Sequence, residues 1–168
     1  CTPTMNLQER VVIGCDSGLV KHYVLGNAQG LFYHGKADSW DEIRSLLHRF
    51  TRSIAVIDAL PDLTEPRRLR EEFPGRVFLC HYAKDRKTFQ LIRWGEGDEF
   101  GNVVADRNRL LQLVIDEFAG NRIPLQGNRE DWGPFYAHWK TLYRLNDTDA
   151  LGNPTWTWET STGEDHWC

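Results

Sequence analysis

Two acidic residues directly follow apolar segments of the kind that forms buried strands. Asp16 follows the run VVIGC, and Asp58 follows the run SIAVI. Sites in open sheets form beyond the carboxyl ends of parallel strands, so neighbouring strands would bring the two carboxylates together. Adjacent carboxylates repel each other unless a proton or a cation lies between them, and such oxygen ligands suit Mg²⁺ or Mn²⁺. The pattern therefore predicts a divalent-metal site.

A third acid would complete a two-metal site of the kind that catalyses phosphoryl transfer, in which the ions lie about 3.5–4 Å apart. The segment GEDHW near the end of the sequence offers Glu164 and Asp165 for this role. The alternative for Asp16 or Asp58 alone is a turn residue that hydrogen-bonds its own backbone. The occurrence of both acids after apolar strands favours a functional site. Packing or surface roles are expected for the histidines of the expected strands and helices, which are His22, His34, His48 and His138.

The elements that must position these acids follow from the apolar pattern of the first half. Apolar runs bounded by Gly, Asn and Pro predict strands at 10–15, 19–26, 30–36, 53–57 and 76–81. Helices are predicted from Ser39, which forms a capping box with Glu42, to Phe50, and from Pro66 to about Phe73. The order is β-β-β-α-β-α-β. It predicts an α/β fold in which an antiparallel meander of three strands continues into parallel strands, with helices on both faces of the mixed sheet.

The second half of the sequence is less regular. We expect strands at 88–94 and 155–159, a polar turn at 96–101, and a helix at 135–145 that carries several aromatic residues. Asp106 is expected to cap a further helix, whose apolar side carries Leu110, Leu111 and Val114. No GxxxxGK[ST] phosphate loop occurs in the sequence, which argues against a nucleotide-binding motor within these residues.

Composition and charge narrow the classes of function. The net charge of −4 excludes a protein that binds nucleic acid through overall basicity. Between residues 65 and 93, however, eight Arg and Lys stand against four acids, so this segment could attract phosphate. The four cysteines lack the close spacing of a zinc site, which indicates inert thiols in a reducing compartment. No apolar run approaches the roughly 18–20 residues of a membrane span.

The order of the elements and acids resembles the ribonuclease H-like nuclease superfamily. More narrowly, it resembles the C-terminal nuclease domain of the large terminase subunit of tailed bacteriophages. The resemblance depends on VVIGCDSG, on SIAVIDALPD with the following helix and FPGRVFLCHY, and on TGEDHWC. The segment VVADRNRLLQLVIDEFAGNRIPLQG is similar to a helix and a short strand of the same family.

This resemblance implies a role for each acid. Asp16 would bridge two divalent ions, Mg²⁺ or Mn²⁺, while Asp58 would hold one ion and Asp165 the other. Glu164 and His166 are further candidates beside them. The implied activity is that of an endonuclease that hydrolyses phosphodiester bonds of double-stranded DNA during packaging of a viral genome in the host cytoplasm. The basic residues expected to contact the DNA backbone follow the fifth strand, and they are Lys84, Arg86 and Lys87.

Residues 1–168 are accordingly expected to form a single nuclease domain, a fragment of a longer chain. An N-terminal ATPase motor domain and a closing C-terminal helix would lie outside it. The full-length protein would work with a portal and a small terminase subunit, and with no membrane. Two alternatives stay open. One is a junction resolvase or transposase-like enzyme of the same superfamily, and the other is a non-catalytic domain that docks DNA or the portal.

Overall fold

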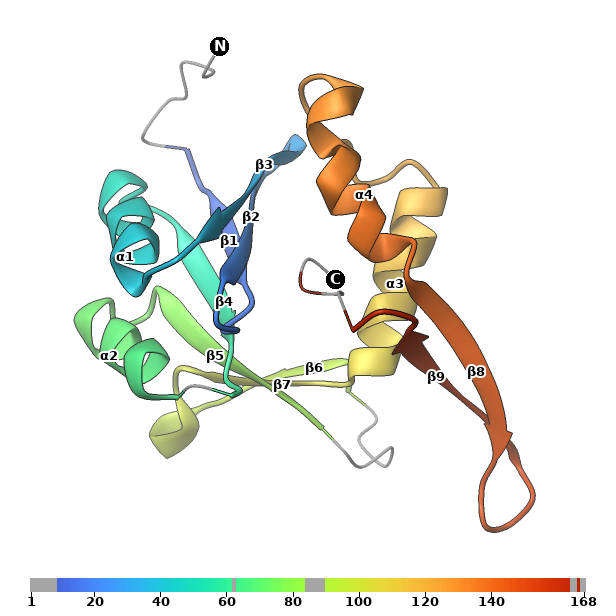
Figure 1. The fold of residues 1–168 in the computed structure, drawn as a ribbon. Helices are drawn as coiled ribbons and strands as arrows, with labels where there is room; N and C mark the ends of the chain where they lie inside the picture. The colour runs from blue at the N-terminus through green and yellow to red at the C-terminus, as the bar shows by residue number, and fades with distance from the viewer. Residues whose placement is uncertain (1–8, 62, 84–89, 164–165, 167–168) are drawn as a thin grey trace.

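The central feature of the fold is a mixed sheet of seven strands with the spatial order β3-β2-β1-β4-β5-β7-β6 (Figure 1). The structure is a computed structural model and describes residues 9–61, 63–83, 90–163 and 166. The strands of the sheet are β1 (Val12–Cys15), β2 (Lys21–Asn27), β3 (Gly30–Ala37), β4 (Ile54–Asp58), β5 (Val77–Tyr82), β6 (Ile92–Trp94) and β7 (Asn102–Ala105).

Strand directions change across the sheet. Strands β1, β2 and β3 form an antiparallel meander, whereas β1, β4, β5 and β7 run parallel to one another. The edge strand β6 is antiparallel to β7. The predicted α/β class and the change from an antiparallel meander to parallel strands are confirmed. Each parallel connection from β1 to β5 contains a helix, as crossover connections usually do.

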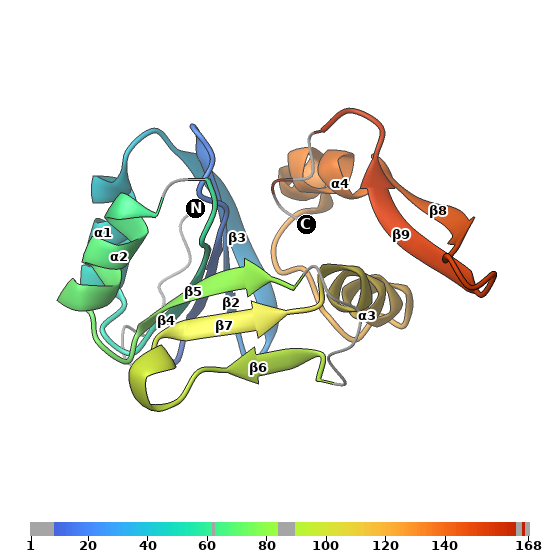
Figure 2. The same cartoon turned by 90° about the horizontal axis from the view of Figure 1, so that it is seen from below.

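Helices lie on both faces of the sheet, as predicted. Figures 1 and 2 show α1 and α2 on one side and α3 and α4 on the other. A two-stranded hairpin, β8–β9, extends away from the sheet beyond α3. The bounds of these elements are α1 (Trp40–Arg49), α2 (Thr64–Glu72), η1 (Gly97–Glu99), α3 (Arg107–Ala119), η2 (Arg129–Trp132), α4 (Gly133–Trp139), β8 (Leu142–Thr148) and β9 (Pro154–Thr160).

The main core lies between the sheet and the helices α1 and α2. Because side chains alternate along a strand, Ile13 and Ile57 point to this side, where they are buried with Ile43 and Leu47 of α1 and Leu69 of α2. A second apolar cluster on the other side of the sheet is centred on the buried residues Trp132 and Phe135. On this side of the sheet, Gly14 of β1 and Val56 of β4 line a cavity together with residues of α3.

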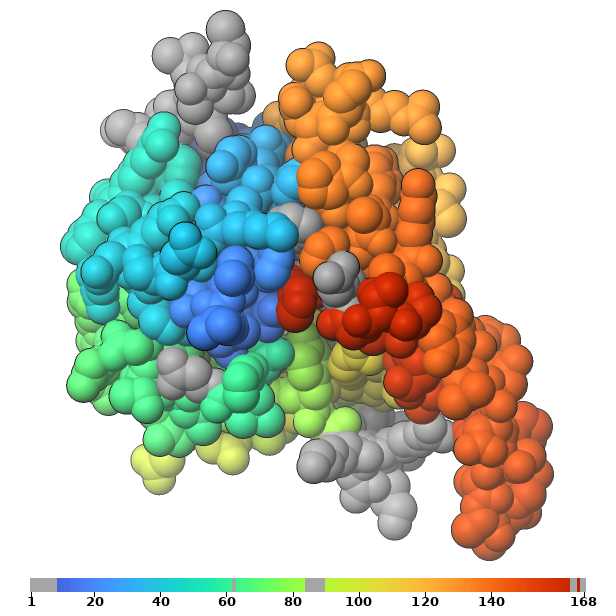
Figure 3. Space-filling view, viewed as in Figure 1, coloured from blue at the N-terminus to red at the C-terminus, as the bar shows by residue number. Residues whose placement is uncertain are grey.

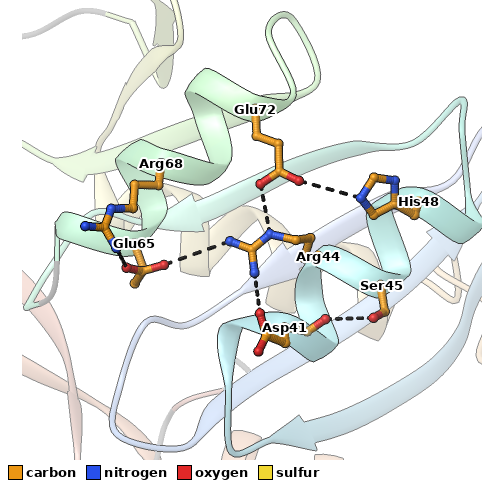
Figure 4. Close-up of polar contacts among 7 residues, drawn as sticks. All are labelled: Asp41, Arg44, Ser45, His48, Glu65, Arg68 and Glu72. Atoms are coloured by element: carbon orange, nitrogen blue, oxygen red, sulfur yellow. Dashed lines mark hydrogen bonds and ion pairs between the residues drawn. The ribbon is translucent and has the colours of Figure 1, made fainter.

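An ion-pair network joins the outer surfaces of α1 and α2 (Figure 4). Arg44 contacts Asp41 on its own helix, and its Nε lies 2.8 Å from Glu72 Oε2 on α2. His48 Nε2 lies 3.6 Å from the other oxygen of Glu72. The network holds the two helices together on the face opposite α3, so it supports the sheet without contributing to the cavity beneath α3.

Two predictions about local structure were wrong, and one strand was not predicted. Helix α4 ends at Trp139 rather than continuing to residue 145, because the chain from Leu142 onward pairs with β9. The four-residue strand β7 was not predicted. Ser39 does occupy the N-cap position of α1, but its side chain makes no capping hydrogen bond, so the expected capping box with Glu42 is absent.

Candidate functional site

The register of β1 and β4 brings Asp16 and Asp58 to the same edge of the sheet. Cys15 pairs with Ile57 in the parallel ladder, so the next residue on each strand is an acid. Adjacent strands lie about 4.8 Å apart, which brings the two carboxyl groups into one small region. Both acids are half-buried and line the same cavity.

This cavity lies between the sheet and α3 and has a volume of about 440 Å³. Its apolar walls come from the α3-facing side of the sheet and from one side of α3, and they include Gly14, Val24, Val56, Leu110, Leu111 and Val114. Because side chains alternate along a strand, Asp16 shares the face of Gly14, and Asp58 shares the face of Val56. The acids therefore sit at the polar end of a mostly apolar pocket.

The surroundings of Asp58 disfavour its charged form. Burial raises the pKa of its carboxyl above the ordinary value, and the charge of Asp16 raises it further. A hydrogen bond from the Leu60 N–H at 3.0 Å and the nearby side chains of His81 and Arg107 act in the opposite direction but do not cancel the effect. Bringing a cation to this pair of carboxylates would relieve the repulsion between them.

Three histidine rings gather next to Asp16. His166 Nδ1 lies 2.7 Å from Asp16 Oδ2, and the His166 ring stacks on His22 with ring centroids 4.5 Å apart. His138 of α4 completes the group, because its ring centroid lies 5.5 Å from that of His22 and 5.8 Å from that of His166. In Figure 3 the C-terminal segment, in red, lies against the blue surface of the first strands. The chain thus returns to the sheet at Asp16.

His22 is neutral in the folded protein near pH 7. Its side chain is 6% exposed, and burial lowers the pKa of the imidazole to about 4, with further lowering by the neighbouring His166, Lys36 and His138. Its Nδ1–H donates a hydrogen bond to the Val20 carbonyl at 3.2 Å, which fixes the proton on Nδ1. The lone pair of this imidazole is then on Nε2.

A second cavity, of about 500 Å³, begins at Asp58 and extends towards β9. It shares Asp58, Tyr82 and Arg107 with the first cavity. Arg107 Nη1 donates a hydrogen bond to the Trp158 carbonyl at 3.0 Å, and Trp158 N donates to Asn108 Oδ1 at 2.8 Å. The acids consequently lie at the junction of two cavities, with a guanidinium group beside them.

The structure brings together three of the residues singled out in the sequence, which are Asp16, Asp58 and His166. The other candidates, Glu164, Asp165, Lys84, Arg86 and Lys87, lie outside the described residues.

Sequence reasoning did not identify His22, Tyr82 or Arg107 as parts of this site. The predicted antiparallel pairing of the first two strands was the available signal for His22. In the structure this pairing continues past the end of β1, where Asp16 N donates a hydrogen bond to the His22 carbonyl at 2.9 Å, so the two residues lie opposite each other. For Arg107, the available signal was its position directly after the predicted helix cap Asp106, which makes it the first residue of α3.

Comparison with family models, with curated proteins and with solved structures gave no match for this chain. Among the helices that the structure describes, none has the length and apolar character to cross a membrane.

Proposed function

We propose that this chain is a ribonuclease H-like nuclease domain that hydrolyses phosphodiester bonds of double-stranded DNA with the help of divalent metal ions. The observation that carries the proposal is the position of Asp16 and Asp58 at the carboxyl ends of two adjacent parallel strands, in one cavity. Sites of open α/β sheets form at this edge.

The topology supports the proposal. An antiparallel meander of β1, β2 and β3 continues through α1 into the parallel strands β4 and β5. This is the order that the resemblance to ribonuclease H-like nucleases implies, with an acid after the first strand and another after the fourth. A fold hosts many functions, so the acids and not the sheet are the argument for nuclease activity.

The residues present fit a divalent ion. Asp16 and Asp58 supply carboxylate oxygens, which Mg²⁺ and Mn²⁺ prefer, and burial, together with the charge of Asp16, raises the pKa of Asp58, so a cation would favour its ionised form. Bound divalent ions would supply an activated water and neutralise charge on the phosphoryl oxygens. Asp16 and Asp58 would hold the ions, and Asp165, adjacent in sequence to His166, is the proposed third ligand.

Other side chains of the cavities would position the substrate. Arg107 lies beside Asp58, where its guanidinium could contact a phosphate oxygen with the planar geometry that arginine offers. The apolar side of α3, with Leu110 and Val114, would limit the access of bulk water to the reacting phosphate. Lys84, Arg86 and Lys87 remain the proposed contacts to the DNA backbone.

The assignment to packaged viral DNA rests on the resemblance of the sequence to terminase nuclease domains. Two of its three motifs, VVIGCDSG and TGEDHWC, contain the residues Asp16 and His166, which contact each other across 150 positions of the chain. That contact supports a common site for the two motifs. In this proposal, the domain would cut DNA delivered by an ATPase motor and a portal.

The test is the nicking of supercoiled plasmid DNA by the wild-type protein in the presence of Mg²⁺ or Mn²⁺, with EDTA as the metal-free reference. We expect cleavage only with added metal. Asp16→Asn and Asp58→Asn should each reduce it by at least about 100-fold, because each removes a charged ligand from the ions. The oligonucleotide products should carry 5′-phosphate and 3′-hydroxyl ends.

Asp98→Asn is the matched control, because Asp98 is an exposed acid of η1 on the connection that leads into β7. It should cut at the wild-type rate. Absence of metal-dependent cleavage by the wild-type protein, or equal cleavage by Asp16→Asn and Asp98→Asn, would refute the nuclease assignment.

A further inference from the structure

The histidines beside Asp16 form a group of possible metal donors that differs in chemistry from the pair of acids. Asp16 follows β1, His22 lies in β2, and His166 lies near the end of the chain. One donor atom of each residue lies within 4.8 Å of the donor atoms of the other two. Three elements remote in sequence therefore bring one carboxylate and two imidazoles together.

The strand order separates this group from Asp58. Strand β1 lies between β2 and β4, so His22 and Asp58 approach Asp16 from opposite sides. Asp16 is the one residue that belongs both to the pair of acids and to the group with the histidines. An ion beside His22 and an ion beside Asp58 would consequently occupy different positions and share a carboxylate.

Polar contacts place both imidazoles for ligation. The Val20 carbonyl accepts the Nδ1 proton of His22, so the lone pair lies on Nε2. His166 Nδ1 lies 2.7 Å from Asp16 Oδ2, a separation that two ligands of one ion can have once the ion replaces the proton between them. For His22, the Val20 carbonyl is the kind of outer partner that usually fixes the remote nitrogen of a metal-binding histidine. Contacts with the buried His138 ring further restrict both rings.

We propose that Asp16, His22 and His166 form a second metal site, which takes a divalent ion of the Zn²⁺, Co²⁺ and Ni²⁺ class in preference to Mg²⁺. Imidazole nitrogen favours these ions, whereas Mg²⁺ favours sites made of oxygen ligands alone. Three protein ligands are the number found in catalytic zinc sites, in which the fourth position takes water or substrate. The ion would also fasten the C-terminal segment to the sheet through His166. This site does not require the proposed hydrolysis.

Co²⁺ is the appropriate probe, because its visible absorption reports ligand type and geometry without any enzymatic assay. The protein, prepared without a histidine tag, is titrated with Co²⁺ in the presence of excess Mg²⁺. We expect one equivalent to bind with intense visible bands that Zn²⁺ abolishes by displacement. His166→Gln and His22→Gln should each weaken Co²⁺ binding by about 10- to 100-fold or more, in line with the loss of a group that holds a metal.

His48→Gln is the matched control, because His48 is an exposed histidine of α1 that pairs with Glu72 on the opposite face of the sheet. It should bind Co²⁺ as the wild type does, and Asp58→Asn should retain the Co²⁺ bands. His166 is 37% exposed, so its substitution should leave the fold intact even if His22→Gln unfolds the buried region.

Wild-type Co²⁺ affinity in both His48→Gln and His166→Gln would overturn the proposal, as would the absence of Co²⁺ binding by the wild-type protein. The two proposals fail separately. A protein that binds Co²⁺ through His166 but never cuts DNA would support this site and refute the nuclease. A protein that cuts DNA with Mg²⁺, and whose His166→Gln variant binds Co²⁺ normally, would refute this site alone.

Discussion

Ser17 Oγ donates a hydrogen bond to the Leu60 carbonyl oxygen at 2.6 Å, and this bond ties the turn after β1 to the turn after β4. The two turns directly follow Asp16 and Asp58. Ser17 is 2% exposed, so the bond is shielded from water at its donor end. A fixed link beside two repelling carboxylates holds them in place before any ion arrives, which is the preorganisation that a metal site needs.

Ser17→Ala should therefore weaken both the fold and the affinity for metal. Without the Ser17 hydroxyl, the Leu60 carbonyl can accept a hydrogen bond from water instead, because Leu60 is exposed. We therefore expect the free energy of unfolding to fall by only about 1 kcal/mol. Urea unfolding in EDTA measures this loss, and calorimetric titration with Mn²⁺ measures the affinity. Ser45→Ala is the control, since Ser45 is exposed on α1 and donates a hydrogen bond within its own helix, to the Asp41 carbonyl. Equal metal affinity in the two variants would contradict the role assigned to Ser17.

Asp58→Asn should stabilise the metal-free protein while it abolishes metal-dependent cleavage. The pKa of Asp58 is raised in the folded state, so its ionised form lowers the free energy of unfolding at every pH above that pKa. A neutral amide removes this penalty, and its oxygen can still accept the Leu60 N–H. We expect Tm in EDTA at pH 7 to rise by roughly 2–4 °C, the change that about 1 kcal/mol produces in a chain of this length.

The pH dependence provides the check on this interpretation. Below the ordinary aspartate pKa of 3.8, Asp58 is protonated in both the folded and the unfolded state, so the advantage of Asn should disappear as the pH approaches this value. Saturating Mn²⁺ at pH 7 should reverse the order of Tm, because only the wild type keeps both acidic ligands. A variant that is less stable than the wild type in EDTA at pH 7 would show that the charge of Asp58 is compensated within the protein.

The sequence was sufficient to predict the two strands that place the acids, whereas their pairing entered only as a condition. The runs VVIGC and SIAVI are short, apolar and rich in β-branched residues, which is the pattern of strands buried on both faces. The acids that follow them mark the strand ends. Local pattern and a general rule about strand ends were enough to expect Asp16 and Asp58 near each other on the condition that their strands are neighbours, and the pairing of β1 with β4 meets that condition.

The elements that failed depend on pairing between distant segments. Leu142 and Leu145 have a spacing compatible with a helix, yet they belong to β8, because they pair with Thr160 and Thr157 of β9. His22, for which packing or a surface position was expected, is buried, but its place beside Asp16 and His166 was not predicted. Its neighbours are set by the hairpin register and by the return of the chain 144 residues later, which local periodicity does not encode.

The buried imidazole of His22 should make the metal-free protein less stable in acid. The pKa of His22 is about 4 in the folded protein, against the ordinary histidine value of 6.5 that applies to the unfolded chain. Between these two values, the unfolded chain therefore binds a proton that the folded protein does not bind. The contribution of neutral His22 to the free energy of unfolding is fully present above about pH 6.5 and is lost progressively as the pH falls towards 4. The loss should be on the order of 2–3 kcal/mol.

Urea unfolding of the wild type and of His22→Gln in EDTA, at intervals from pH 7.5 to pH 4, isolates this contribution, because the carboxyl groups titrate in both proteins. The difference in unfolding free energy between the two should shrink as the pH falls. Parallel curves across this range would show that His22 is protonated as easily in the folded protein as in the unfolded one.

Arg107 should act on the substrate in the proposed reaction rather than on the ions. It lies at the junction of the two cavities beside Asp58, and as a cation it would be attracted to a phosphate and not to a metal ion. Arg107→Ala should lower kcat for plasmid nicking by on the order of 100-fold, the cost of losing one group that stabilises developing charge. Arg107→Lys should recover part of the rate, since it keeps the charge and loses the planar fork.

A merely structural role for Arg107 predicts a different result, because its hydrogen bond to the Trp158 carbonyl joins α3 to β9. In that case, Arg107→Ala would lower Tm and the affinity for Mn²⁺ along with the rate. We expect the Mn²⁺ affinity to stay within about twofold of the wild type while kcat falls, since no ligand of the ions is removed. Arg109→Ala, two residues further along the same helix and exposed, should cut at the wild-type rate. Equal rates for Arg107→Ala and Arg109→Ala would exclude Arg107 from the reaction.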